Sequence, residues 1–214
     1  ILFDLDGTLI EPDSEALGNL ARRLQPLQRL LPRRDPAWAA RRILMSAEGP
    51  ANSLLTFLNR IGLDDTFLDL GDRLRRMQGL HTPLNFRPVD CVGDMLHELS
   101  HRYHLGLVTT RCCAHAEGFL KQQELADLFQ VVVGREDTWR IKPHPSPVRH
   151  AADELGLATE RCLLVGDTIS DIYAARSAGA RSAGVLCGFG IEAELEGAGA
   201  DLILNTTSEL GKWM

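Results

Sequence analysis

From about residue 86 onward, the sequence alternates predicted helices with short, apolar, β-branched strands. The predicted strands cover residues 105–109, 131–133, 163–165, 183–186 and 202–204. The segments between them have the apolar spacing of helices, at about 89–102, 113–125, 146–155 and 170–178. Strands that alternate with helices in this way form parallel crossover units. The pattern therefore predicts an α/β fold built on a doubly wound, mainly parallel sheet.

A further strand is predicted at the start of the chain, and a long helical stretch separates it from the alternating region. Leucines recur there at three- and four-residue steps, at Leu17, Leu20, Leu24, Leu27 and Leu31. Several prolines divide the stretch into short helices, and no strand pattern interrupts it. We therefore expect a core domain formed by residues 1–12 and 81–214, with an all-helical domain, residues 13–80, inserted after the first strand.

Two carboxylates, Asp4 and Asp6, follow the apolar start of the chain, and Gly7 ends the predicted strand. Open α/β sheets bind ligands at the carboxyl ends of their strands. Two carboxylates this close repel each other unless a proton or a cation lies between them, and Mg²⁺ is a suitable cation. The alternative is an ordinary turn, in which Asp and Gly are common.

Two other segments carry groups that can bind a phosphoryl oxygen. One predicted strand ends in Thr109, Thr110 and Arg111, whose hydroxyl, backbone N–H and guanidinium groups can donate hydrogen bonds. The other segment is 141–147, in which three prolines surround Lys142. The chain has three lysines and twenty arginines, so a required ammonium group is favoured at this position. A common strand threonine and an incidental loop lysine are the alternatives.

A fourth segment repeats the pattern of an apolar strand that runs into glycine and aspartate. Asp167 follows Gly166 directly, and Asp171 comes four residues later, in the predicted first turn of a helix. Asp167 can complete the oxygen shell of a metal, and Asp171 can orient that metal or the lysine. Alternatively, Asp171 serves only to stabilise the positive end of the helix dipole.

Together these motifs resemble those of the haloacid dehalogenase superfamily. Asp4-x-Asp6-Gly-Thr, Thr109, Lys142 and Gly166-Asp167-Thr-x-x-Asp171 match its four ordered motifs across nearly the whole chain. The helical insertion is similar to the C1-type cap of the phosphoglycolate-phosphatase-like branch. The resemblance implies a Rossmann-like core, Mg²⁺ as cofactor and activity on a small phosphorylated metabolite.

The resemblance also implies a role for each matched residue. Asp4 is expected to be the nucleophile that forms an aspartyl-phosphate, and Asp6 to be the general acid and then the general base. Thr109 and Lys142 are expected to hold the phosphoryl oxygens. Apart from the resemblance, Thr110 and Arg111 are further candidates for substrate binding, and Arg111 could contact either the phosphate or the cap. The expected metal ligands are Asp4, the backbone carbonyl of Asp6, and Asp167, with Asp171 behind them.

Several reactions are known for this family, and hydrolysis of a phosphomonoester is the one favoured here. Asp6 is not needed by dehalogenases and is replaced by threonine in the ATPases, and residues 13–80 contain no lysine for a Schiff base. A sugar phosphomutase is the alternative, although the Gly-x-x-Arg-x-x-Ser-like segment of the mutases is absent near residues 46–53. A non-catalytic binding domain is a further alternative. It is disfavoured, because such a domain would need neither a nucleophile nor an acid.

Composition and charge limit the partners and the cellular compartment that we expect for this chain. A net charge of −6 argues against a nucleic-acid partner, and no apolar stretch is long enough to span a membrane. Five cysteines without a Cys-x-x-Cys spacing favour a reducing cytoplasm over a disulfide framework. The chain starts without methionine, so we expect a few leading residues to be missing. A monomer and a homodimer are both compatible with the sequence.

Two other motifs are interpreted as having no catalytic or metal-binding role. His97-Glu98-x-x-His101 has the spacing of a zinc-protease motif, but its histidines fall on the polar side of the predicted helix and no third ligand is evident. Cys112 and Cys113 are adjacent and are interpreted as two ordinary thiols.

Overall fold

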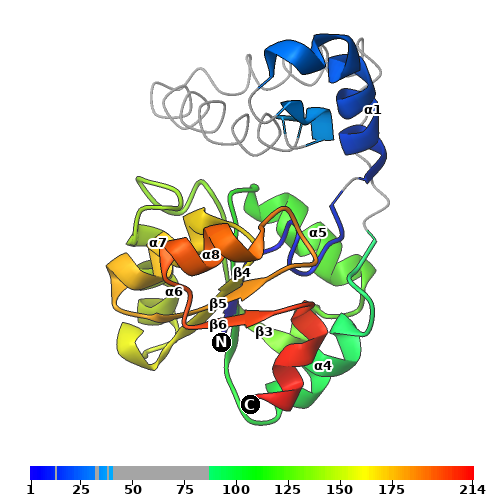
Figure 1. Ribbon diagram of the computed structural model, residues 1–214. Helices are drawn as coiled ribbons and strands as arrows, with labels where there is room; N and C mark the ends of the chain where they lie inside the picture. The colour runs from blue at the N-terminus through cyan, green and yellow to red at the C-terminus, as the bar shows by residue number, and fades with distance from the viewer. Residues whose placement is uncertain (13, 32–33, 38, 41–86) are drawn as a thin grey trace, which may run out of the picture. The chain divides into compact units, whose positions relative to one another are not determined.

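The structure is a computed structural model of the 214-residue chain (Figure 1). It describes residues 1–12, 14–31, 34–37, 39–40 and 87–214. The chain divides into two compact units, one formed by Ile1–Pro12 and Phe86–Met214, the other by Asp13–Asn85.

The first unit contains a six-stranded parallel sheet in the order β3-β2-β1-β4-β5-β6. Its strands are β1 (Leu2–Phe3), β2 (Leu105–Val108), β3 (Phe129–Val133), β4 (Leu163–Gly166), β5 (Arg181–Val185) and β6 (Leu202–Leu204). Its α-helices are α4 (Val92–Ser100), α5 (Cys113–Gln122), α6 (Ser146–Glu154), α7 (Ile169–Ala178) and α8 (Glu192–Ala198). Short 3-10 helices are η3 (Ala126–Leu128), η4 (Thr159–Arg161) and η5 (Thr207–Lys212). The predicted doubly wound parallel sheet is confirmed.

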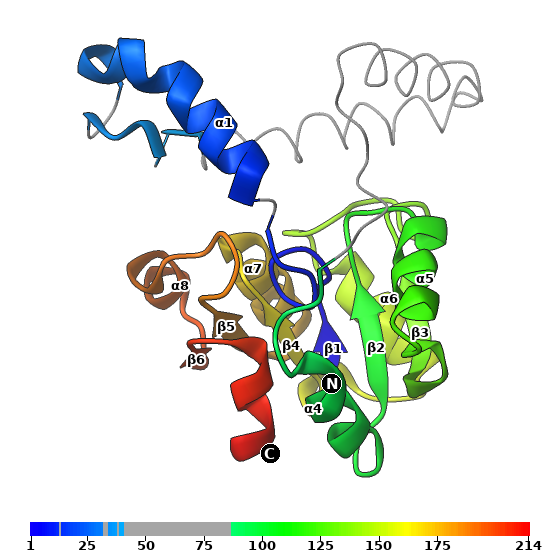
Figure 2. The ribbon, with the colours of Figure 1, turned by 90° about the vertical axis from the view of Figure 1, so that its right-hand side faces the viewer.

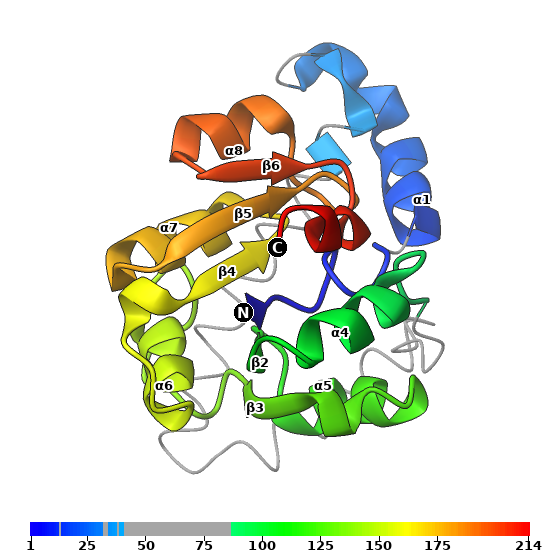
Figure 3. The same cartoon turned by 90° about the horizontal axis from the view of Figure 1, so that it is seen from below.

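Helices cover both faces of this sheet (Figure 2 and Figure 3). Successive strand residues point to opposite faces, so Phe3 and Val165 pack in one core, and Leu2 and Leu164 in the other. The first core also holds buried residues of α4, α5 and η5, and the second those of α6 and α7. The central strands are therefore buried on both sides, which explains their nearly continuous apolar sequences.

The chain leaves the first unit and returns to it at two adjacent segments. Ile10 forms an antiparallel bridge with Pro88, and the backbone N–H of Glu11 donates to the carbonyl of Arg87 over 2.8 Å. The N–H of Val89 donates to the carbonyl of Leu9 over 2.9 Å. A long insertion is thus accommodated without opening the sheet, because its two ends are paired at the edge of the core.

Within the second unit, the described part contains α1 (Ser14–Leu24) and the 3-10 helix η1 (Gln25–Leu30). The helical pattern of leucines up to Leu24 thus corresponds to a helix. Leu27 lies in the 3-10 helix η1, and Leu31 follows its end. The predictions for residues 41–80, including those on residues 46–53, lie outside the described residues, so the helical cap stays a prediction there. Among the described helices, none is long and apolar enough to cross a membrane.

Among the described α-helices of the first unit, one has no counterpart in the sequence prediction, and the three short 3-10 helices were not predicted either. Helix α8 is seven residues long and buries only two of them, Leu195 and Ala198. Two apolar residues in a short Glu-, Ala- and Gly-rich segment give no visible helical period. The strands and the other α-helices of this unit lie at their predicted places, with shifts of a few residues at their ends.

Candidate active site

Polar side chains gather at the carboxyl ends of the three central strands. Asp4 follows β1, Thr109 follows β2 and Asp167 follows β4, and all three are buried. Between β1 and β4 the chain changes direction across the sheet, and open α/β sheets form their ligand crevice at such a switch point. Lys142, from the loop between β3 and α6, and Asp171, from the first turn of α7, complete the buried group.

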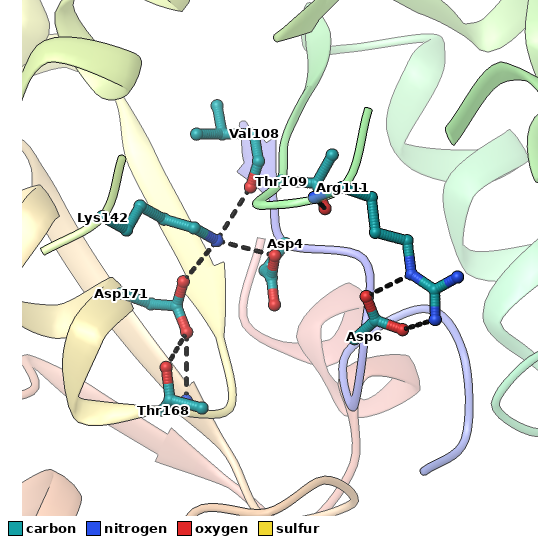
Figure 4. A network of polar contacts seen from close by, with 8 residues as sticks. All are labelled: Asp4, Asp6, Val108, Thr109, Arg111, Lys142, Thr168 and Asp171. Atoms are coloured by element: carbon teal, nitrogen blue, oxygen red, sulfur yellow. Dashed lines mark hydrogen bonds and ion pairs between the residues drawn. The ribbon is translucent and has the colours of Figure 1, made fainter. Parts of the chain in front are cut away.

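Lys142 joins two of these carboxylates (Figure 4). Its Nζ lies 2.6 Å from Oδ1 of Asp4 and 2.6 Å from Oδ1 of Asp171, and it donates to the carbonyl of Val108 over 2.8 Å. Burial acts to lower the pKa of Lys142, but Asp171 and Asp4 outweigh it and raise this pKa above its usual value. The ammonium group is therefore charged at any physiological pH. The Lys142–Pro143 peptide bond is cis.

Three buried carboxylates, of Asp4, Asp167 and Asp171, offer oxygen atoms within 4.8 Å of one another. Burial raises the pKa of Asp4 to about 7, with Lys142 opposing the shift and Asp171 adding to it. Burial, followed by Asp171 and Asp4, also raises the pKa of Asp167 well above its usual value. One lysine cannot neutralise three carboxylates, so the site favours protons or a further cation.

Asp167 is held by the loop that follows β5. The backbone N–H of Phe189 donates to its Oδ2 over 2.6 Å, while its Oδ1 has no hydrogen-bond partner among the described residues. Two glycines, Gly7 and Gly188, approach the carboxylate so closely that a Cβ at either position would overlap it. Gly7 also has a φ of 74°, which favours glycine.

These donors fit Mg²⁺, which prefers hard oxygen ligands. Oδ1 of Asp167 supports this fit, because it has no hydrogen-bond partner among the described residues and is completely buried beside Asp4 in a group with excess negative charge. Asp171 has less capacity for a metal, because its Oδ1 contacts Lys142 and its Oδ2 accepts from Thr168 Oγ1 over 2.6 Å and Thr168 N over 3.0 Å. The last two contacts form a capping box that fixes Asp171 in the first turn of α7.

The Asp6 carboxylate points elsewhere. Nε and Nη2 of Arg111 donate to Oδ2 and Oδ1 of Asp6, each over 2.6 Å (Figure 4). Thr109 is linked to the same segment, since the backbone N–H of Arg111 donates to its Oγ1 over 3.1 Å. Thr110, between them, is half-buried.

The structure thus brings together Asp4, Lys142, Asp167 and Asp171, with Thr109 at the end of the neighbouring strand. Asp6 and Arg111 form a separate pair at the same edge of the sheet. Sequence reasoning did not find the contributions of Thr168 and Phe189. Thr168 and Asp171 have the Thr-x-x-Asp spacing of a capping box, which was a usable signal. The backbone N–H of Phe189 gives no such signal, because its position in a loop cannot be read from the sequence.

The other candidate motifs are not part of the buried group. His97 and His101 are exposed, and among the described residues the group that could hold a metal consists of Asp4, Asp167 and Asp171. The cysteines that the structure describes are all free.

Comparison with known proteins agrees with this geometry. The family model described as "Haloacid dehalogenase-like hydrolase" matches residues 1–185, which include every residue of the buried site. The chain belongs to this family. The membership inferred from the four motifs is confirmed, and the protein is a hydrolase of the haloacid dehalogenase type.

Individual relatives of this haloacid dehalogenase-like hydrolase carry different names. A pyrophosphatase, PpaX, from Bacillus cereus is 30% identical over 211 residues, covering 98% of this chain and 93% of its own. A predicted phosphoglycolate phosphatase from Haemophilus somnus is 22% identical with a TM-score of 0.64, covering 99% and 96% of the two chains. A candidate β-phosphoglucomutase from Thermotoga maritima is 20% identical with a TM-score of 0.66 and the same coverage. The two structures show a shared fold.

Proposed function

We propose that this hydrolase is a Mg²⁺-dependent phosphatase that acts on a small phosphorylated metabolite through an aspartyl-phosphate. The observation that carries the proposal is the buried group of Asp4, Lys142 and Asp167, in which the Asp4 carboxylate contacts an ammonium group and lies near a carboxylate that has an oxygen without a hydrogen-bond partner among the described residues. Phosphoryl transfer depends mainly on positioning and on neutralising charge, and these residues provide both.

In the first step, an oxygen of Asp4 forms a bond to phosphorus while the bond from phosphorus to the leaving oxygen breaks. Lys142 keeps the carboxylate in place and offsets the negative charge of the phosphoryl group, and the Thr109 hydroxyl binds a phosphoryl oxygen. Asp6 gives a proton to the leaving oxygen. The product of this step is a phosphate ester on Asp4 and a free leaving group.

In the second step, water attacks the phosphorus and gives its proton to Asp6. The bond between phosphorus and Asp4 breaks, which releases phosphate and restores the carboxylate. When bound, Mg²⁺ would supply positive charge beside the transferring group, held by Asp4, the backbone carbonyl of Asp6, and Asp167. Asp171 would keep Lys142 oriented.

Phosphate release tests the proposal directly. Sugar phosphates, phosphoglycolate, nucleotides and pyrophosphate would be screened with and without Mg²⁺, using the wild type, Asp4→Asn and the control Asp94→Asn, which changes an exposed residue on α4. We expect Mg²⁺-dependent release that Asp4→Asn abolishes and Asp94→Asn retains. No release from any substrate, or full activity of Asp4→Asn, would contradict the proposal.

A sugar phosphomutase uses the same core residues, and one structural neighbour bears that name. Conversion of β-glucose 1-phosphate to the 6-phosphate without net phosphate release would support that alternative. The cap segment 46–53, on which the sequence distinction rests, lies outside the described residues.

A further inference from the structure

Asp6 is held by Arg111 through two short hydrogen bonds. Each of its oxygens accepts from a different guanidinium nitrogen over 2.6 Å, and the Asp6 and Arg111 side chains are 23% and 28% exposed. Bidentate pairs of this kind, with both partners charged, are among the strongest hydrogen-bonded contacts in proteins. Both oxygens of the proposed acid are therefore occupied.

This pair is incompatible with the role proposed for Asp6. To protonate a leaving group, one Asp6 oxygen must carry a proton and point at the leaving oxygen, whereas here both accept from Arg111. The contact with Arg111 must therefore open before the proton is transferred. The backbone N–H of Arg111 donates to Oγ1 of Thr109 over 3.1 Å, so Arg111 stays next to the residue that is expected to bind the phosphoryl group.

Opening the pair has an energetic cost, since it leaves a partly buried guanidinium without the carboxylate that it binds. A second anion at the same position offsets that cost. The phosphoryl group itself is expected at Thr109 and Lys142, so the additional charge has to come from the other part of the substrate. A leaving group that carries its own negative charge next to the scissile bond meets this requirement.

We propose that Arg111 is a specificity-determining residue, which exchanges Asp6 for an anionic leaving group of the substrate. The site then selects phosphoryl compounds such as inorganic pyrophosphate over esters with a neutral leaving group. This inference rests on the proposed phosphatase function and adds a substrate class to it. It also gives substrate binding a direct role in freeing the acid.

The protons balance in this scheme. When Arg111 moves to the substrate, Asp6 takes a proton from solvent and then passes it to the leaving oxygen as the phosphorus–oxygen bond breaks. In hydrolysis of the aspartyl-phosphate, Asp6 takes a proton from the attacking water. It returns that proton to solvent after phosphate has left, and the pair with Arg111 forms again.

The test compares kcat/KM for pyrophosphate with kcat/KM for phenyl phosphate, whose leaving group is neutral once protonated. We expect Arg111→Gln to lower the ratio of kcat/KM for pyrophosphate to kcat/KM for phenyl phosphate by about 10-fold to 100-fold. This is the effect expected from the loss of one hydrogen bond between charged groups. Arg111→Lys keeps the positive charge but cannot donate two parallel hydrogen bonds, so it should lower this ratio less. Arg161→Gln, an exposed residue of η4 before β4, should leave the ratio unchanged.

Equal losses for both substrates in Arg111→Gln, or no loss for either, would overturn the inference and leave the phosphatase proposal intact. A binding measurement further distinguishes a failure of this inference from a failure of the phosphatase proposal. In an Asp4→Asn background, calorimetry should show that Arg111→Gln weakens binding of pyrophosphate and not of orthophosphate. This result does not depend on turnover, so inactivity of the wild type would contradict the phosphatase proposal alone. Unchanged pyrophosphate binding would overturn the role of Arg111.

Discussion

Nζ of Lys142 lies 2.6 Å from Oδ1 of Asp4, although 138 positions separate the two residues in the sequence. Their side chains are 3% and 10% exposed, so water contributes little to screening this ion pair. Oδ1 of Asp171 contacts the same ammonium group, also over 2.6 Å. One positive charge thus links the end of β1, the loop before α6 and the start of α7, which makes the core depend on it.

Removing this charge should destabilise the fold. For Lys142→Met, we expect the free energy of unfolding to fall by about 3–5 kcal/mol at about pH 8, because buried carboxylates are left without their partner. Urea unfolding in the absence of metal, followed by circular dichroism, measures the change. Lys121→Met is the matched control, since that exposed lysine lies 3.4 Å from Glu117 on α5 and should contribute about 0.5 kcal/mol or less. Similar losses in the two variants would contradict the prediction.

Gly188 should be needed for metal binding. In Gly188→Ala, the new Cβ overlaps the Asp167 carboxylate, which must move away from Phe189 and from its position beside Asp4. We expect weaker Mg²⁺ binding by about 10-fold to 100-fold, the range seen when a group that supports a metal ligand is lost. Calorimetric titration of the metal-free protein with Mg²⁺ measures this.

A second glycine gives the control for that experiment. Gly118 lies inside α5, and a Cβ added there would meet nothing within 4 Å. Gly118→Ala should therefore raise the free energy of unfolding by about 0.5–1 kcal/mol and leave Mg²⁺ binding unchanged. Equal Mg²⁺ affinity in the two alanine variants would show that Gly188 does not position Asp167.

The fold was largely predictable because its strands are short apolar runs that end in distinctive residues. Burial on both faces gives β2 and β4 their continuous apolar sequences, and a glycine or polar residue marks where each ends. Helix α8 was not predictable, because only Leu195 and Ala198 face the core. A seven-residue helix with two buried positions cannot show a period.

The candidate site was predictable in its residue types but not in its pairings. The positions of Asp4, Lys142 and Asp167 follow from the parallel sheet, which brings the ends of distant strands together. The pairing of Asp6 with Arg111 depends on side-chain directions, which a sequence pattern does not contain. The same is true of the Phe189 N–H, because any residue except proline has this donor.

Cys113 should be an unreactive thiol, although it is not fully buried. Burial raises the pKa of Cys113 to about 12, and its Sγ donates to Oδ2 of Asp137 over 2.9 Å, which adds to the shift. Because the thiolate is the reactive form, iodoacetamide at about pH 8 should alkylate the exposed Cys91 and leave Cys113 mostly unmodified, as peptide mass mapping can show. Asp137→Asn should increase the labelling of Cys113. Equal rates at the two cysteines of the wild type would contradict this.

The raised pKa values of the site carboxylates also determine how stability depends on pH. The pKa of Asp4 is about 7 in the folded protein and that of Asp167 is also raised, whereas both return toward 3.8 on unfolding. Between about pH 4 and pH 7 the folded state therefore binds more protons than the unfolded state. In the absence of metal, these groups therefore lower the free energy of unfolding as the pH rises through this window.

Mg²⁺ should reverse this trend, because it binds the ionised carboxylates and must displace their protons. We expect the increase in Tm caused by Mg²⁺ to be small at about pH 5.5 and to grow as the pH rises to about pH 7.5, with at most about a tenfold change in Kd per pH unit for each proton displaced. Thermal unfolding with and without Mg²⁺ at each pH measures the shift. Asp167→Asn should show no shift at any pH, while Asp94→Asn should behave as the wild type. A shift in the wild type that does not depend on pH would mean that Mg²⁺ binds elsewhere.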